Sequence, residues 1–171
     1  NLYRGMGRTL DLIPDYFAGS VNTYGPLYFD LQSILIRING LHPWIFRLPN
    51  LASGYLAIAI LYCVLRLHNV NKSMALLFGL ACSLDVSVNR VLVSGRMDFL
   101  SVLFVSAALL MVSIRSARLN MRLIFFLSAG FFSSMAFLTT PRSLFLLPAV
   151  AVVGIHCLLR ADNRKHLKSH S

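Results

Sequence analysis

Long apolar runs separated by short polar stretches form the main pattern of the chain. A hydrocarbon core about 30 Å thick is crossed by roughly 20 apolar residues in a helix, and a helix satisfies its own backbone hydrogen bonds in lipid. The pattern therefore predicts an all-α, polytopic transmembrane helix bundle of about five spans. The predicted spans are Leu48–Leu65, Met74–Val93, Phe99–Ile114, Leu123–Thr139 and Ser143–Leu159.

A sixth apolar run, Leu27–Ile38, has only twelve residues and contains Asp30, Gln32 and Arg37. Runs of this length are typical of interfacial or re-entrant segments, so we expect a helix near the membrane surface. The alternative is a full span that continues to Trp44, which would reverse the orientation of all later spans relative to residues 1–25. The resulting organisation is an outer-face loop over 1–47 with a juxtamembrane helix at 27–38, a helix bundle over 48–160, and a basic cytoplasmic tail or loop over 161–171.

Composition agrees with a membrane protein. Hydrophobic residues make up 57% and charged residues 13% of the chain, and mean hydropathy is +0.69, whereas about a quarter of a soluble domain is charged. The net charge of +10 does not indicate nucleic acid, because the cations fall between apolar runs instead of clustering on one soluble face. We expect a multi-pass protein of a bacterial inner membrane or of the endoplasmic reticulum.

The distribution of cations predicts the orientation of the spans. One set of connections, together with the C-terminal tail, holds nine of the sixteen Lys and Arg residues: Arg66, Lys72, Arg115, Arg118, Arg122, Arg160, Arg164, Lys165 and Lys168. Short loops rich in Lys and Arg stay in the cytoplasm, so the other connections lie on the outer face, the periplasm or the lumen.

Each outer turn carries one arginine: Arg47-Leu-Pro-Asn50, Ser94-Gly-Arg96-Met-Asp98 and Thr139-Thr-Pro-Arg142. A planar guanidinium matches the geometry of phosphate oxygens. The alternatives are anchoring at the interface by a snorkelling side chain and a structural ion pair such as Arg96–Asp98. Three arginines on one face favour an anionic ligand.

Four short motifs, in order, resemble the polytopic glycosyltransferases of the GT-C fold, which include protein O-mannosyltransferase-like enzymes and lipid A aminoarabinose transferases. Tyr24-Gly-Pro-Leu-Tyr-Phe29 is similar to the family's Pro-Pro-Leu-aromatic motif, and Arg47-Leu-Pro-Asn-Leu-Ala-Ser-Gly54 to its Arg-Leu-Pro entry into a span. Gly95-Arg96-Met-Asp98 resembles its Arg-x-Asp motif, and Ala136-Phe-Leu-Thr-Thr-Pro-Arg142 a later turn. The resemblance covers roughly residues 1–160.

This resemblance implies transfer of a sugar from a polyprenyl-phosphate donor to a glycan, lipid or protein acceptor on the periplasmic or lumenal face. The family's general base is an aspartate of an Asp-Glu pair, which aligns just before Asn1 and so outside this sequence. Two other positions depart from the family. Arg142 replaces the usual lysine, and Tyr24-Gly25 stands where relatives carry a basic residue and proline.

Transfer from a lipid phosphate needs a carboxylate beside cations that match the charge on the leaving group. The candidate catalytic residues are Asp98 and Asp85. The candidates for binding substrate or phosphate are Arg47, Arg96, Arg142, Tyr24 and Arg4. Each aspartate has a structural alternative, because Asp98 can stabilise a helix N-terminus and Asp85 can pair with Arg90.

Two other functions remain open from the sequence: a transporter or channel, in which the charges line a substrate path, and a non-catalytic membrane subunit. The chain contains no Walker loop, GxGxxG, HExxH or nucleophile elbow, which disfavours a nucleotide-sugar donor. The residues do not decide whether a divalent metal ion takes part.

Overall fold

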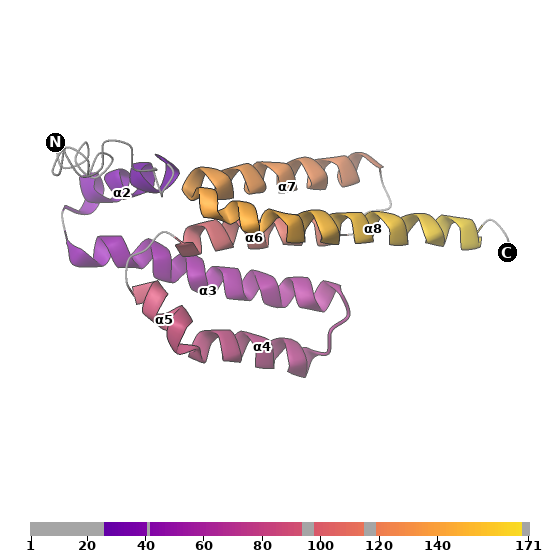
Figure 1. Ribbon diagram of the computed structural model, residues 1–171, viewed down its shortest axis with the longest axis horizontal. Coiled ribbons are helices and arrows are strands. Elements are labelled where there is room, and N and C mark those ends of the chain that lie inside the picture. Colours follow the sequence, from indigo (N-terminus) through magenta and orange to yellow (C-terminus); the bar gives the residue numbers. More distant parts are fainter. Residues whose placement is uncertain (1–25, 41, 94–97, 115–118, 169–171) are drawn as a thin grey trace.

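The computed structural model describes residues 26–40, 42–93, 98–114 and 119–168, and every regular element within these ranges is helical (Figure 1). Together with the apolar runs, this confirms the prediction of a helical membrane fragment. The elements in chain order are α2 (Pro26–Asn39), α3 (Pro43–Leu67), α4 (Lys72–Leu84), α5 (Val86–Val93), α6 (Asp98–Ser113), α7 (Leu119–Thr139), the 3-10 helix η2 (Pro141–Phe145) and α8 (Leu147–Lys168).

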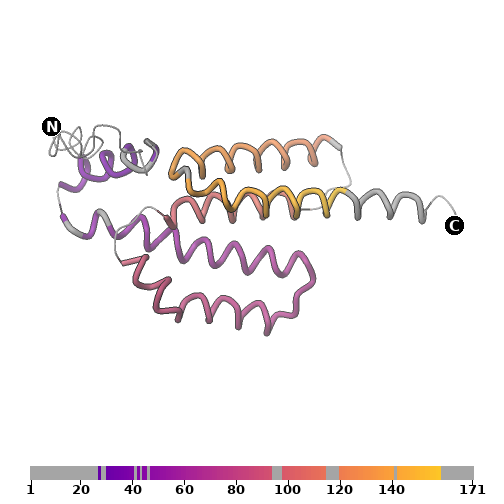
Figure 2. Tube along the Cα trace, in the orientation of Figure 1, coloured from indigo at the N-terminus to yellow at the C-terminus, as the bar shows by residue number. Residues whose placement is uncertain are grey.

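The long helices lie side by side with alternating directions, as Figures 1 and 2 show. α6 is the central helix, because it contacts α3, α7 and α8, while α4 packs on α3. One end of the bundle, here called the α2 end, holds α2, α5, η2, the first turns of α3 and α6, and the last turn of α7 (Figure 1). The other, here called the turn end, holds the α3–α4 turn at 68–71 and the first turn of α7.

Prolines define the helix boundaries at the α2 end. The α-helical region is disfavoured for the residue before a proline, and both His42 and Thr140 are extended, with φ/ψ of −128/145° and −153/128°. His42 therefore precedes α3, and Thr140 separates α7 from η2. These two prolines favour the helix starts near Arg47 and Arg142, whereas Pro49 lies inside α3.

The five predicted spans are helical, but Met74–Val93 comprises the two helices α4 and α5, and Ser143–Leu159 begins in η2 and continues in α8. The spans also differ in length. Two are long and apolar enough to cross a membrane individually, Arg47–Leu67 of α3 and Asn120–Thr139 of α7, and the pair α4–α5 makes a third if it is one bent span. Asp98–Ser113 and Arg142–Leu158 are shorter apolar helices. At 1.5 Å per residue, a helix such as the 16-residue α6 covers about 24 Å, a little less than the hydrocarbon core.

The prediction of one continuous helix over Met74–Val93 is wrong. α4 and α5 are separate helices bent by 56° at Asp85. Side chains satisfy the backbone groups that the break releases: the Asp85 carboxylate accepts a hydrogen bond from Val88 N (2.8 Å), and Asn89 Nδ2 donates to Ser83 O (2.7 Å) and Asp85 O (3.1 Å). Polar side chains that compete with the helix ladder can stabilise such a break.

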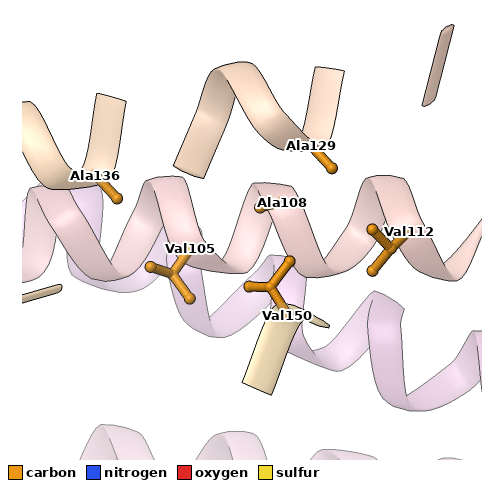
Figure 3. Packing of buried hydrophobic residues seen from close by; sticks show 6 residues of the cluster. All are labelled: Val105, Ala108, Val112, Ala129, Ala136 and Val150. Carbon is orange, nitrogen blue, oxygen red and sulfur yellow. The ribbon is translucent and has the colours of Figure 1, made fainter. Parts of the chain in front are cut away.

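The largest cluster of buried apolar residues lies between α6, α7 and α8 and consists of alanines and valines, with larger, partly buried side chains packed against it. Val105, Ala108 and Val112 of α6 face Ala129 and Ala136 of α7 and Val150 of α8 (Figure 3). Small residues let helix backbones approach closely, which provides the van der Waals contact that holds membrane helices together.

The prediction of a short helix over Leu27–Ile38 is confirmed as secondary structure, since α2 spans Pro26–Asn39. Leu31 packs against the buried Leu100 of α6. Ile34 and Ile38 are 52% and 72% exposed. α2 therefore packs on the bundle through one face and presents apolar side chains on another.

Candidate functional site

Two of the predicted phosphate-binding arginines, Arg47 and Arg142, lie at the α2 end of the bundle. Arg47 is in the second turn of α3 and Arg142 is in η2, and both side chains are exposed. Neither guanidinium forms a hydrogen bond or ion pair with any part of the chain that the structure describes. Both are therefore accessible to an anionic ligand at this end.

Asp98, the preferred catalytic candidate, begins α6 at the same end and is half-buried. An acid in the first turn of a helix interacts favourably with the helix dipole. Ser101 Oγ donates a hydrogen bond to the backbone carbonyl oxygen of Asp98 at 2.7 Å. This bond does not involve the Asp98 carboxylate. The structure thus places one carboxylate at the end that holds Arg47 and Arg142.

Asp85, the second catalytic candidate, occupies a different environment. Its side chain is exposed, and it caps α5 through its hydrogen bond with Val88 N. Within the described residues no ion pair joins Asp85 to Arg90, so the alternative ion pair does not form. The geometry assigns Asp85 to the α4–α5 break.

The other predicted site residues, Arg96, Tyr24 and Arg4, lie outside the described residues. Arg96 belongs to the segment 94–97, which connects the described ends Val93 and Asp98. Both of those ends lie at the α2 end of the bundle, because α5 ends there and α6 begins there (Figure 1).

Sequence reasoning missed a layer of buried polar side chains at the α2 end. Its members, each at most 9% exposed, are Gln32, Ser33, Asn50, Ser53, Ser101, Thr139, Thr140 and Ser143. Several hydroxyls bond to their own helix, as Thr139 Oγ1 does to Met135 O (2.8 Å). Asn50 Oδ1 and Ser143 Oγ are buried without a hydrogen-bond partner among the described residues. The α2 end is therefore polar in its interior as well as on its surface.

Part of this layer was detectable in the sequence. Asn50 follows Arg47 by three residues, slightly less than one helical turn, and Ser53, Gly54 and Ala57 continue a small-residue face along the same helix. Thr139 and Thr140 end an apolar run directly before a proline. Which of these polar groups are buried depends on the neighbouring helices, and no periodicity specifies that.

The described ranges contain no group of three or more His, Cys or Asp side chains placed to hold a metal ion. The free thiols of Cys63, Cys82 and Cys157 are separate from one another. Within the described ranges we therefore assign no metal ligands.

An apolar helix bundle with two or three candidate spans is the architecture of a helical membrane protein. The profile of the family described as dolichyl-phosphate-mannose-protein mannosyltransferase matches residues 23–171. The chain therefore belongs to this family of membrane glycosyltransferases, which use a sugar carried on a polyprenyl phosphate. No curated protein and no solved structure matches the chain.

Proposed function

We propose that the α2 end is the part of a membrane glycosyltransferase that binds the phosphate of a polyprenyl-phosphate sugar and presents the sugar to an acceptor on the periplasmic or lumenal face. The single observation that carries the proposal is that Arg47, Asp98 and Arg142, from three separate regions of the sequence, lie at one end of the bundle. The acceptor is a glycan, lipid or protein hydroxyl.

The reaction is a substitution at the anomeric carbon of the sugar. A bond forms between that carbon and the acceptor oxygen, the bond to the phosphate oxygen breaks, and the polyprenyl phosphate leaves with the electron pair. The acceptor's proton passes to a carboxylate base. In this proposal Arg47 and Arg142 stabilise the charge that develops on the phosphate, and Asp98 contacts the acceptor. Arg96 and Tyr24, in the 94–97 and 1–25 segments, are further candidates for contacts with the phosphate.

The break between α4 and α5 is a feature that transporters also show at their substrate sites. Here, however, Asp85 and Asn89 bond to the backbone around the break. The family match over residues 23–171 favours glycosyl transfer over transport.

A transfer assay tests the proposal directly. The intact membrane protein is reconstituted into liposomes with a radiolabelled polyprenyl-phosphate mannose and an acceptor peptide or glycan. Arg142→Gln should lower the rate of transfer about 100-fold, the loss typical for removing one group that stabilises developing negative charge. The matched control is Arg122→Gln in α7, an arginine at the turn end, which should stay within about twofold of the wild-type protein.

Equal rates for Arg142→Gln and Arg122→Gln would contradict the assignment of the phosphate to the α2 end. Vesicle uptake of the sugar without any covalent transfer would instead favour a transporter.

A further inference from the structure

An apolar groove runs between α7 and α8. Both helices pack on α6, but within the part of the chain that the structure describes they make few contacts with each other. The groove has a volume of about 320 Å³, and its lining includes Val112 of α6, Phe126 and Gly130 of α7, and Val150, Gly154 and Leu158 of α8. Val112 and Val150 also belong to the buried cluster in Figure 3. The groove is therefore an open side of that apolar cluster.

The groove is about as long as one leaflet of a membrane is deep. Its lining on α8 extends from Leu147 to Leu158, a rise of about 16 Å at about 1.5 Å per residue. One leaflet contributes about 15 Å to a hydrocarbon core about 30 Å thick. A lipid chain that enters from one membrane surface therefore has the length to fill the groove.

The groove is too narrow for another helix. A volume of about 320 Å³ spread over about 16 Å gives a mean cross-section of about 20 Å². A helix with its side chains is about 10–12 Å wide and so occupies about 80 Å² or more. An extended hydrocarbon chain, which is one methylene group wide, fits this section. Gly130 and Gly154 leave room for it, because neither has a side chain.

One cation continues the groove-lining face of α7 toward the turn end. Arg122, in the first turn of α7, precedes Phe126 by four residues and so lies on the same face of the helix. Helical side chains tilt toward the helix N-terminus, which for α7 is the turn end. Arg122 is half-buried and forms no hydrogen bond or ion pair with any residue that the structure describes. Its guanidinium is therefore available to an anion at the turn end of the groove.

A phospholipid carries the two groups that this arrangement matches. A guanidinium binds a phosphodiester through charge-assisted hydrogen bonds, and an acyl chain is about as long as one leaflet is deep. The turn end also carries Arg66 and Lys72. Because each cation near a membrane surface attracts anionic lipid, an anionic headgroup is favoured over a zwitterionic one.

We propose that the groove between α7 and α8 binds one anionic phospholipid from the leaflet at the turn end, with its phosphate on Arg122 and one acyl chain against Gly130 and Gly154. The chain covers the side of the apolar cluster that the helices leave open. This site goes beyond the proposed function. It opens at the end of the bundle opposite to Arg47 and Arg142, so loss of the lipid leaves the groups proposed for sugar transfer in place.

Native mass spectrometry of the intact membrane protein in a mild detergent tests the site, with phosphatidylglycerol as the probe. Arg122→Gln should raise the Kd of the first bound phosphatidylglycerol about tenfold, the loss expected when a hydrogen bond to a charged group is removed. Gly130→Leu should raise it at least as much, because the new side chain fills the groove. A Cβ added at Gly130 meets nothing within 4 Å, so this variant introduces no clash at that atom.

The matched control is Ser134→Leu, which adds the same side chain at an exposed position of α7 outside the groove lining. It should bind phosphatidylglycerol like the wild-type protein. Phosphatidylcholine should bind the wild-type protein about fivefold more weakly, the effect of about one further cation near the headgroup.

The direction of the lipid is tested with a phosphatidylglycerol that carries a diazirine at the end of one acyl chain. On irradiation it should crosslink to α8 near Leu147, the end of the groove farther from Arg122, and unlabelled phosphatidylglycerol should compete for this product. The crosslink also tests the site if Gly130→Leu does not fold.

Three results would overturn the proposal. The first is an unchanged Kd in Arg122→Gln or in folded Gly130→Leu, and the second is equal binding of phosphatidylcholine. The third is competition for the crosslink by polyprenyl phosphate and not by phosphatidylglycerol, which would assign the groove to the donor's chain. None of these measurements uses sugar transfer, so failure of this inference and failure of the proposed function are distinguishable.

Discussion

The two ends of the bundle both carry exposed cations, but the cations have different bonding partners. At the turn end, Arg66 Nη1 donates to Val70 O at 2.8 Å and so stabilises the turn after α3. The Asn71 side chain accepts from Ser73 N at 3.2 Å and caps α4. At the α2 end, Arg47 and Arg142 make no such contact within the described residues. Arg66 at the turn end thus contributes to the fold, whereas Arg47 and Arg142 at the α2 end are accessible to a ligand.

The buried polar groups at the two ends also differ in whether they have hydrogen-bond partners. A layer of buried polar side chains lies at the α2 end, and two of its atoms, Asn50 Oδ1 and Ser143 Oγ, lack partners. At the turn end the buried hydroxyl of Ser113 donates to Leu109 O (2.6 Å) and is also hydrogen-bonded to His68 Nε2 (3.1 Å). Buried polar groups cost free energy unless they are paired. The unpaired atoms at the α2 end therefore reduce the stability of the fold, whereas the paired hydroxyl of Ser113 at the turn end does not. Functional sites are where proteins accept such costs.

The largest expected effect concerns the sides of the membrane. Cysteines are introduced singly at the exposed positions Asn39, at the α2 end, and Lys72, at the turn end, in a protein whose three native cysteines are alanine. In right-side-out vesicles a membrane-impermeant thiol reagent should label position 39 and leave position 72 unlabelled, because cation-rich loops stay in the cytoplasm. Labelling of position 72 alone would show that the turn end, and not the α2 end, lies on the outer face.

The second effect separates the two candidate carboxylates. Asp98→Asn should lower sugar transfer about 100-fold, because an amide cannot take part in proton transfer or bind the acceptor as a carboxylate does. Asp85→Asn should stay within about twofold, since an asparagine oxygen can still accept from Val88 N. Initial rates at saturating donor measure both. If both variants lost the same fraction of the transfer rate, Asp85 would be part of the site as well. If Asp98→Asn transferred sugar at the normal rate, Asp98 would not be part of the site.

The third effect is on stability at the turn end. In a double-mutant cycle of His68→Phe and Ser113→Ala, the coupling free energy should be about 0.6 kcal/mol, the average for hydrogen bonds between membrane helices. Reversible unfolding in mixed detergent micelles measures it. Because this contact lies away from the α2 end, sugar transfer by each folded variant should stay within about twofold of wild type. A large loss of transfer would show that the ends are coupled.

The smallest effect concerns two buried serines. Ser143→Ala should change the free energy of unfolding by less than about 0.5 kcal/mol, or raise it slightly, because the hydroxyl that is removed has no partner. The matched control is Ser106→Ala, since Ser106 is equally buried and donates to Val102 O at 2.8 Å; it should destabilise the protein. If Ser143→Ala lowered transfer without changing stability, Ser143 would be a ligand contact.

The apolar runs and the prolines allowed the helices to be predicted from the sequence. Each predicted span corresponds to a helical segment, because hydrophobicity and backbone hydrogen bonding in lipid admit few alternatives. The exception, Met74–Val93, has the hydropathy of a span but contains Ser83, Asp85 and Asn89, whose side chains bond to the backbone at the break. Mean hydropathy over a window does not detect such local competition.

The candidate site was predicted less completely. Arg47, Asp98 and Arg142 were identified from their turns and from a family resemblance that the match over residues 23–171 confirms. Their roles stay predictions. Asn50 was quoted as part of a motif without a role, because its partners, Val91 and Leu92, are 41 and 42 residues away.

The sequence by itself determined the class of protein, the positions of the helices and the uneven distribution of cations, since these depend on transfer of side chains into lipid and on local backbone sterics. Only the tertiary structure decided that α5 turns back onto α3 and contacts Asn50 and Gly54, and that polar side chains are buried at the α2 end. Those features depend on which helix faces meet, and the free energy of such contacts depends on both partners. An arginine therefore stabilises a turn at the turn end, where Arg66 bonds to Val70 O, whereas Arg47 and Arg142 belong to the candidate site at the α2 end.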